Sequence, residues 1–435
     1  MFRVSKKLGA ALATAAVATL ALAACSAPAE SEDGPVELTY FTWSDATAVA
    51  QAEALVEAFT AENPDITVTL DANPGGAEGD NLVKTRLSTG EMSDVMAYNS
   101  GSLLQALNPE ATLVDLSDEP WMADVDEDFR TSVSAGEGVY GAPTGTAQAG
   151  GVIYSKKIYD ELGLTVPATW DEFMANNQVI ADAGIVPFYQ AYGDGWTSQL
   201  TVLGSFANVT SADPDWATEY TAGQRRYAEE PAFQSFQHLQ DVAEAGFFNE
   251  NFPSATNDDA MAALVDGTAA HYPMLTSVAL SNLRQNFPDA MQDMGVFPVP
   301  ADDAADTALT IWEPNAIYIP KTTEGAKLEA AKKFVAFFNS EKGCELQNET
   351  EPGGPYVIST CTLPDDVAPM VTDVQQWVED GKSGLALEFI SPIKGPNLEG
   401  ILVEVGSKIT TAEEGAAAYD EDVKKQAQQL GLEGW

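Results

Sequence analysis

Strand-like segments alternate with helical segments along most of this chain. Residues 36–43 alternate in polarity and are rich in β-forming side chains, and a helix carrying Leu55, Val56 and Phe59 is expected behind Ser44. Further strands are expected at residues 66–70, 95–98, 151–154, 186–189 and 316–320, with helical segments between them. Strands separated by helices predict an α/β protein with a largely parallel sheet.

The N-terminus predicts export. Arg3, Lys6 and Lys7 precede an apolar run that ends in small residues at Cys25, so residues 1–24 are interpreted as a signal peptide and Cys25 as a lipidation site. The apolar run is shorter than the roughly 20 residues that span a bilayer. Residues 25–35 then form a lipidated N-terminus and a polar linker. Plain secretion, with Cys25 an accident of an Ala-rich signal, is the alternative.

The length and the net charge of the mature chain limit its domain organisation and the partners that it can bind. Removing 24 of the 435 residues leaves 411, which exceeds what one hydrophobic core usually serves, so two lobes are expected. The signal contains three of the 21 basic residues, and the 18 that remain face 66 acidic ones, a formal charge of −48. Such a surface repels phosphate backbones and anionic lipid headgroups. We therefore expect no nucleic-acid partner, and membrane contact through the lipid anchor only.

Histidines and cysteines give little support for metal or nucleophilic chemistry. His238 and His271 are the only histidines and neither stands in a ligand pattern, so no metal and no cofactor are expected. Cys344 and Cys361 are the only thiols besides Cys25, and an exported chain with an even pair favours a disulfide. Closing that loop stabilises a fold by about 3 kcal/mol on a chain-entropy model.

A set of ordered motifs resembles the extracellular solute-binding proteins of ABC importers, and within them the carbohydrate-binding, maltose-binding-protein-like branch. The motifs are Phe59 with Asn63-Pro64-Asp65-Ile66, Tyr140-Gly141-Ala142-Pro143, Tyr154-Ser155-Lys156, Pro167-Ala168-Thr169-Trp170-Asp171-Glu172-Phe173, and the segment from Ala330 to Glu345. Each motif alone is weak, but together they follow the expected order through nearly all of the mature chain.

The resemblance implies a two-lobed, periplasmic-binding-protein-like fold of type II, in which each lobe is a mixed sheet flanked by helices. Placed on this sequence, lobe 1 comprises residues 36–142 and 300–351, and lobe 2 comprises residues 143–299 and 352–435. Segments that cross between the lobes would form a hinge near residues 142–144, 297–309 and 352–358, and few residues at element ends can absorb such a rotation.

A sugar presents apolar faces and a rim of hydroxyls, so its site needs aromatic platforms, carboxylates and amides. The candidates lie mostly in loops: Trp43, Ser44, Asp45, Asn99, Ser100, Asp194, Trp196, Trp312, Glu313, Asn315, Tyr356, Glu388 and Phe389. The tryptophans could instead be packing residues, and Asn99 a helix cap. Many relatives carry a tryptophan shortly after the segment that reads Gly267-Thr268-Ala269-Ala270 here, and only Tyr272 could substitute for it.

The expected function is therefore capture of a neutral oligosaccharide by an exported, lipid-anchored monomer, which delivers it to the permease subunits of an ABC importer. We expect no enzymatic activity. A surface-anchored glycoside hydrolase stays open because carboxylate separation is not visible in a sequence. A polyamine- or peptide-binding protein on the same scaffold is the other alternative.

Overall fold

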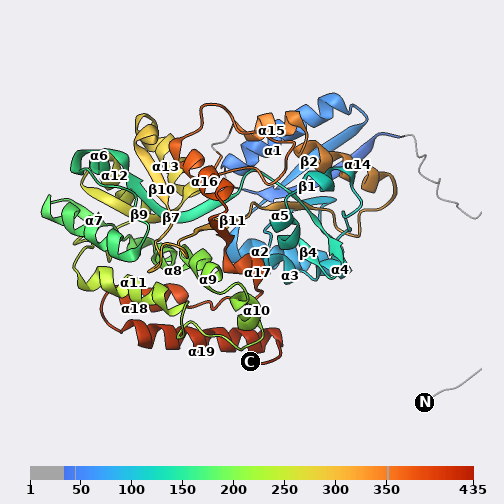
Figure 1. Cartoon of the computed structure of the whole chain (residues 1–435). Coiled ribbons are helices and arrows are strands. Elements are labelled where there is room, and N and C mark those ends of the chain that lie inside the picture. The colour runs from blue at the N-terminus through green and yellow to red at the C-terminus, as the bar shows by residue number, and fades with distance from the viewer. Residues whose placement is uncertain (1–33, 45, 350–351) are drawn as a thin grey trace, which may run out of the picture. The chain divides into compact units, whose positions relative to one another are not determined.

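Two mixed β-sheets organise the computed structural model (Figure 1), which describes residues 34–44, 46–349 and 352–435. The folded unit runs from Val36 to Trp435. The expected signal peptide, the lipidation site Cys25 and the candidate ligand residue Asp45 lie outside the described residues, as does nearly all of the linker.

The first sheet has the strand order β2-β1-β3-β12-β6. Its strands are β1 (Val36–Trp43), β2 (Ile66–Asn73), β3 (Val95–Tyr98), β6 (Gly141–Pro143) and β12 (Ala316–Tyr318). β1 pairs in parallel with β2 and β3, so the loops that follow these three strands leave from the same edge of the sheet. That edge is where an α/β sheet usually presents its ligand.

Helices from the early part of the chain and from residues 325–347 accompany this first sheet. They are α1 (Ala46–Glu62), α2 (Gly76–Thr89), α3 (Ser102–Gln105), α4 (Pro109–Thr112), α5 (Glu127–Ser132), α14 (Gly325–Phe338) and α15 (Glu341–Gln347), with the short 3-10 helix η1 (Pro120–Asp124) and the hairpin β4 (Ser134–Ala135)–β5 (Gly138–Val139). Phe59 of α1 meets Phe334 and Phe337 of α14 with ring centroids 5.0 and 5.6 Å apart. These aromatic contacts join an early helix to a late one.

The second sheet has the strand order β13-β11-β7-β9-β8, and β10 also pairs with β7. Its strands are β7 (Gln148–Ser155), β8 (Val186–Phe188), β9 (Ala269–Leu275), β10 (Met294–Phe297), β11 (Leu309–Trp312) and β13 (Ser383–Leu385). β7 is the centre of this sheet because β9 covers one of its edges while β10 and β11 share the other.

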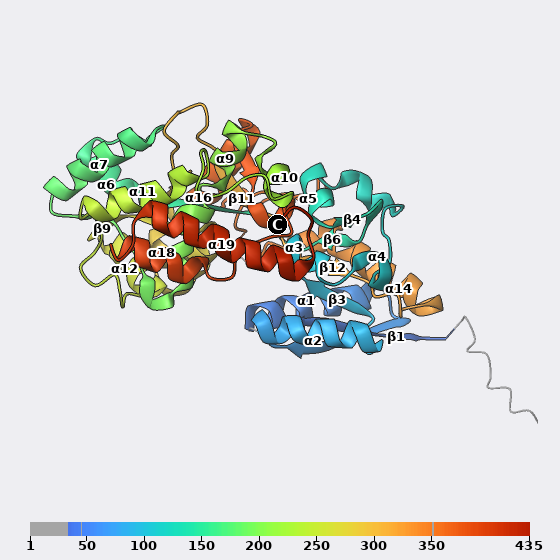
Figure 2. The same cartoon turned by 90° about the horizontal axis from the view of Figure 1, so that it is seen from below.

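The helices around the second sheet come from the middle and the end of the chain. They are α6 (Lys156–Leu162), α7 (Trp170–Asp182), α8 (Leu200–Leu203), α9 (Phe206–Ala212), α10 (Trp216–Thr221), α11 (Phe233–Glu244), α12 (Asn257–Asp266), α13 (Thr276–Asn286), α16 (Pro369–Glu379), α17 (Leu387–Ile390), α18 (Leu398–Gly406) and α19 (Ala412–Leu430), with the 3-10 helices η2 (Tyr192–Asp194), η3 (Trp196–Gln199) and η4 (Pro288–Asp293). Figure 2 shows α19 running beside α18, and the two share a buried cluster with α11 that includes Phe236, Leu402 and Tyr419.

The prediction of a largely parallel sheet was wrong, whereas the expectation of mixed sheets is confirmed. Parallel pairing joins β1 to β2 and β3, β8 to β9, and β11 to β13. In contrast, β12 is antiparallel to both of its neighbours, and β7 is antiparallel to β9, β10 and β11. The physical reason is that strands late in the chain return into sheets begun earlier, and hydrophobic patterning does not encode their direction.

The lobe boundaries stay a prediction, with one adjustment that strand pairing favours. β11 pairs with β7, so residues 309–312 belong to the second sheet, although the predicted lobe 1 begins again at residue 300. β12 already belongs to the first sheet. The second crossing then lies at residues 313–315, between β11 and β12.

A disulfide joins Cys344 of α15 to Cys361, 17 residues further along the chain. Both cysteines are buried. The loop that this bond closes includes the third crossing segment, where Gly353 accepts a hydrogen bond from the Thr276 hydroxyl at the start of α13.

Candidate functional site

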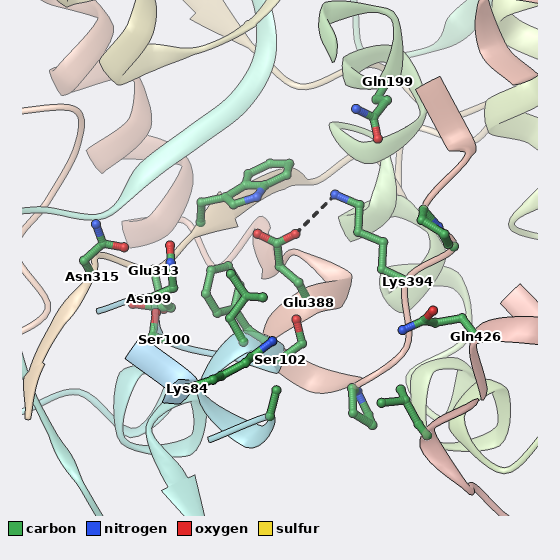
Figure 3. Close-up of a pocket in the computed structure, with 18 of the residues that line it drawn as sticks. Lys84, Asn99, Ser100, Ser102, Gln199, Glu313, Asn315, Glu388, Lys394 and Gln426 are labelled. Carbon is green, nitrogen blue, oxygen red and sulfur yellow. Dashed lines mark ion pairs between the residues drawn. The ribbon is translucent and has the colours of Figure 1, made fainter. Parts of the chain in front are cut away.

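A cavity of about 610 Å³ lies where residues of both sheets and of the C-terminal helices meet. It is lined by Lys84, Asn99, Ser100, Ser102, Leu103, Ala106, Gln148, Gln199, Trp312, Glu313, Asn315, Glu388, Phe389, Pro392, Lys394, Gly395, Pro396, Gln426 and Leu430. Figure 3 shows Asn99, Ser100, Glu313 and Asn315 grouped on one side, with Gln199, Lys394 and Gln426 on the other. The volume and the mixture of one indole with many polar groups suit a molecule of oligosaccharide size.

Asn99 and Ser100 are held at the carboxyl end of β3 by contacts to the second crossing. The Ser100 hydroxyl donates a hydrogen bond to the carbonyl of Pro314 at 2.8 Å, and the Tyr318 hydroxyl donates to the carbonyl of Asn99 at 3.0 Å. The backbone of this loop is therefore fixed. The Asn99 side chain lines the cavity and does not bond to the helix start, which favours a binding role over a cap.

Trp312 ends β11 and lines the cavity with only 8% of its surface exposed. Its indole lies directly over Gly150 of β7, where a Cβ atom would overlap the ring. Glycine at this position therefore lets the indole lie against the sheet. A fixed indole at a cavity wall can act as a stacking platform.

Glu313 is a carboxyl group of this cavity whose pKa is strongly raised. It is 7% exposed, and its Oε2 atom is buried without a hydrogen-bond partner among the described residues. Burial raises its pKa to about 8, with a further contribution from the negative charges of Asp128 and Asp126. At neutral pH this side chain is therefore mainly a neutral acid that can both donate and accept a hydrogen bond.

Glu388 and Phe389 reach the cavity from α17. The Glu388 carboxylate pairs with Lys394 at 3.5 Å (Figure 3). Gly101 follows Ser100 with a φ of +69°, and a Cβ there would meet the Glu388 carbonyl and the Phe389 ring. This close approach keeps α17 against the loop after β3.

Two smaller hollows continue the cavity. One, of about 500 Å³, is lined by Trp43, Ser44, Pro74, Gly75 and Gly76 and shares Asn99 with the main cavity. The other, of about 240 Å³, includes Tyr356, and it shares Gln148, Glu313 and Asn315. Trp43 lines the first of these hollows, and its half-buried ring also packs against Phe41 and Tyr98 at centroid distances of 5.4 and 6.1 Å.

Three predicted residues lie outside these hollows. Tyr272 is fully buried in β9, so it offers no face to a ligand and we withdraw it from the site. The Asp194 carboxylate accepts a hydrogen bond from the Asn257 backbone N–H at 2.6 Å, at the start of α12. Trp196 is 37% exposed and stands three residues before Gln199, which does line the main cavity.

Several polar side chains of the cavity were not predicted from the sequence. They are Lys84, Ser102, Gln148, Gln199, Lys394 and Gln426. Most belong to helices or to the interior strand β7, where a polar residue resembles ordinary surface or packing sequence. The strand β7 does carry a signal at Gln148, because this residue opens an otherwise apolar segment.

His271 has a structural setting, and no metal cluster is found in the part of the chain that the structure describes. His271 is fully buried between the Tyr159 hydroxyl, 2.7 Å from Nε2, and the Asn177 amide oxygen, 3.0 Å from Nδ1. Burial lowers its pKa to about 3, so the ring is neutral.

None of the helices among the described residues combines the length and the apolar character needed to cross a membrane.

Two sheets with three connections between them, and a polar cavity with aromatic walls beside those connections, define a ligand-binding protein of the two-lobed, type II class. The chain belongs to the bacterial extracellular solute-binding proteins, whose family model matches residues 43–343. The membership that the motifs predicted is thereby confirmed. Because this family is extracellular, the protein is exported.

Two relatives of known cargo are similar to this chain. The multiple sugar-binding protein of Streptococcus mutans is 24% identical over 363 residues, which cover 81% of this chain and 83% of the relative. The melibiose/raffinose/stachyose-binding protein MelE of Bacillus subtilis is 25% identical over 333 residues, which cover 73% and 74%. Among solved structures, the apo form of RafE from Streptococcus pneumoniae superimposes with a TM-score of 0.74 at 21% identity, covering 91% of this chain and 98% of that one. This last comparison supports the fold.

Proposed function

We propose that this protein captures a neutral oligosaccharide in the cavity around Trp312 and delivers it to the permease of an ABC importer. The observation that carries the proposal is the wall of the cavity, where one buried indole stands among amide, hydroxyl and carboxyl groups. An indole face stacks on the apolar face of a pyranose, and the polar rim satisfies its hydroxyls.

The relatives narrow the class of cargo. MelE is named as a protein that binds melibiose, raffinose and stachyose. The fully buried Tyr272 leaves no platform at the position where many relatives carry a tryptophan. A cavity of about 610 Å³ with one buried indole favours a short oligosaccharide of this kind over a long linear chain.

The charges in the cavity disfavour a cationic ligand. Glu388 is paired with Lys394, Lys84 adds a second cation, and Glu313 is mainly neutral at pH 7. The large negative charge of the chain is therefore not concentrated in the site. This is the observation against a polyamine as cargo.

The relatives support binding without catalysis, because both are named as binding proteins. A glycoside hydrolase needs two carboxyl groups with distinct roles across the scissile bond. Glu313 and Glu388 are the carboxyl groups that line the main cavity, so the test of this function includes a search for cleaved sugar. We further propose that the mature protein is a monomer whose lipid at Cys25 holds it at the outer face of the membrane.

A thermal-shift screen tests this function. Mature protein is heated with raffinose, stachyose, melibiose and linear maltodextrins, with spermidine and short peptides as controls, because a ligand of the native state raises Tm by mass action. We expect a rise with an α-galactoside and intact sugar afterwards by chromatography. Cleaved sugar would mean a hydrolase, and a rise with spermidine alone would replace the sugar proposal.

A further inference from the structure

Glu313 stands at the junction of the two sheets and faces more than one hollow. It follows β11 directly as the first residue of the crossing to β12, and it lines both the main cavity and the 240 Å³ hollow that includes Tyr356. Its Oε2 atom has no hydrogen-bond partner in the described part of the chain, although the side chain is almost completely buried. An unsatisfied polar atom in that position costs free energy until a ligand or a water completes it.

We propose that Glu313 enters the ligand complex as a neutral carboxylic acid, donating one hydrogen bond to a ligand oxygen and accepting another, so that capture of the ligand is linked to a proton. This proposal rests on the proposed sugar-binding function and specifies how the same site is regulated. A hydroxyl group of a sugar suits such a partner, because it accepts and donates at one atom.

The charged groups around Glu313 favour the neutral form. Asp126 and Asp128 at the start of α5 are the acidic groups that act on it, and burial acts in the same direction by raising its pKa. Arg130 of α5 acts on Asp126, and Lys84 and the Glu388–Lys394 pair line the same cavity, but no ion pair connects any of these cations to Glu313. A negative charge at Glu313 would thus be buried without compensation.

The linkage has a defined direction. A bound ligand removes remaining water from the carboxyl group, so the complex favours the protonated form more strongly than the free protein does. Affinity is therefore expected to be constant from pH 6 to pH 7 and to fall as the pH rises through about 8. Well above that pH, Kd rises up to about tenfold per pH unit if only the neutral acid binds.

Calorimetric titration with the best sugar from the screen, between pH 6 and pH 9.5, tests this linkage. Wild-type protein should lose affinity at high pH and take up protons on binding there, measured from the dependence of the heat on the ionisation enthalpy of the buffer. Glu313→Gln keeps a donor and an acceptor but cannot ionise, so its affinity, several-fold lower at pH 7, should not change with pH. Glu57→Gln, at an exposed site on α1, should behave as the wild type. A flat wild-type profile, or a Glu313→Gln profile that still falls, would overturn the proposal.

Infrared spectroscopy separates this inference from the choice of ligand. The carbonyl band of a protonated carboxylic acid should be present at pH 7 in ligand-free wild type, absent in Glu313→Gln, and lost as the pH rises above 8. If no sugar binds at any pH but this band is seen, the proposed function fails while the neutral Glu313 stands. Absence of the band at pH 7 refutes the neutral Glu313 whatever the protein binds.

Discussion

Single residues decide whether the cavity has an aromatic surface on which a sugar ring can stack. Trp312 carries the apolar face of the site, and its position depends on a neighbour without a side chain, Gly150. Glu313, next in the chain, supplies a polar group that burial keeps neutral. One rigid aromatic face and one adaptable acid therefore come from adjacent positions at the end of a single strand.

Replacing Gly150 by alanine should displace the indole. The added methyl group overlaps the ring of Trp312. Such overpacking typically lowers stability by about 1–3 kcal/mol. We expect Gly150→Ala to weaken sugar binding and to change the tryptophan fluorescence. Gly400→Ala, where no atom lies within 4 Å of the added methyl group, is the matched control and should change neither. Unchanged binding by Gly150→Ala would mean that the indole does not contact the ligand.

His271 should make the fold sensitive to mild acid. Its folded pKa of about 3 lies below the ordinary histidine pKa of 6.5, so the unfolded state binds more protons between these two values. The contribution of the neutral ring is fully present above pH 6.5 and is lost as the pH falls toward 3, by at most about 1.4 kcal/mol per pH unit. In urea unfolding, His271→Gln should therefore be more destabilising at pH 7.5 than at pH 5. An equal cost at both pH values would contradict a neutral, buried ring.

At the scale of elements, the sequence predicted the strands and helices better than their partners. Residues 36–43, 95–98 and 316–320 were expected as strands, and β1, β3 and β12 are found there. The direction of β12, and the position of β11 beside β7, were not predictable because pairing depends on contacts between residues far apart in the chain. Gln148 and Lys394 were missed for a related reason: Gln148 opens a strand and Lys394 lies in the loop between α17 and α18, and only the folded chain brings them to one cavity.

The disulfide should stabilise the fold by closing the loop that contains the third crossing. Removing it with Cys344→Ala/Cys361→Ala frees a loop of 17 residues and should lower the free energy of unfolding by about 3 kcal/mol. Urea unfolding with and without a reductant measures this: the reductant should destabilise the wild type and leave the double variant unchanged. A wild type that is indifferent to reduction of the bond would contradict the stabilising role.

At the scale of the whole folded unit, the cavity depends on three connections between two sheets. Residues that follow β3, end β11 and belong to α17 are far apart in the sequence, and they line one cavity because the chain passes between the sheets more than once. The motifs predicted this class of fold, and several predicted candidates line the cavity, including Asn99, Trp312 and Glu388. They failed for Tyr272, since whether an aromatic side chain in a strand faces the core or a cavity depends on the packing of helices on that sheet.

The most direct test of the account is the affinity of Trp312→Ala for the sugar identified in the screen, measured by isothermal titration calorimetry. Loss of a buried stacking platform should cost about 1–3 kcal/mol of binding free energy, which is roughly a fivefold to 150-fold rise in Kd. Trp377→Ala, at a half-buried tryptophan of α16 outside the cavity, controls for general loss of structure. An unchanged Kd for Trp312→Ala, with the native fold retained, would show that the sugar binds elsewhere.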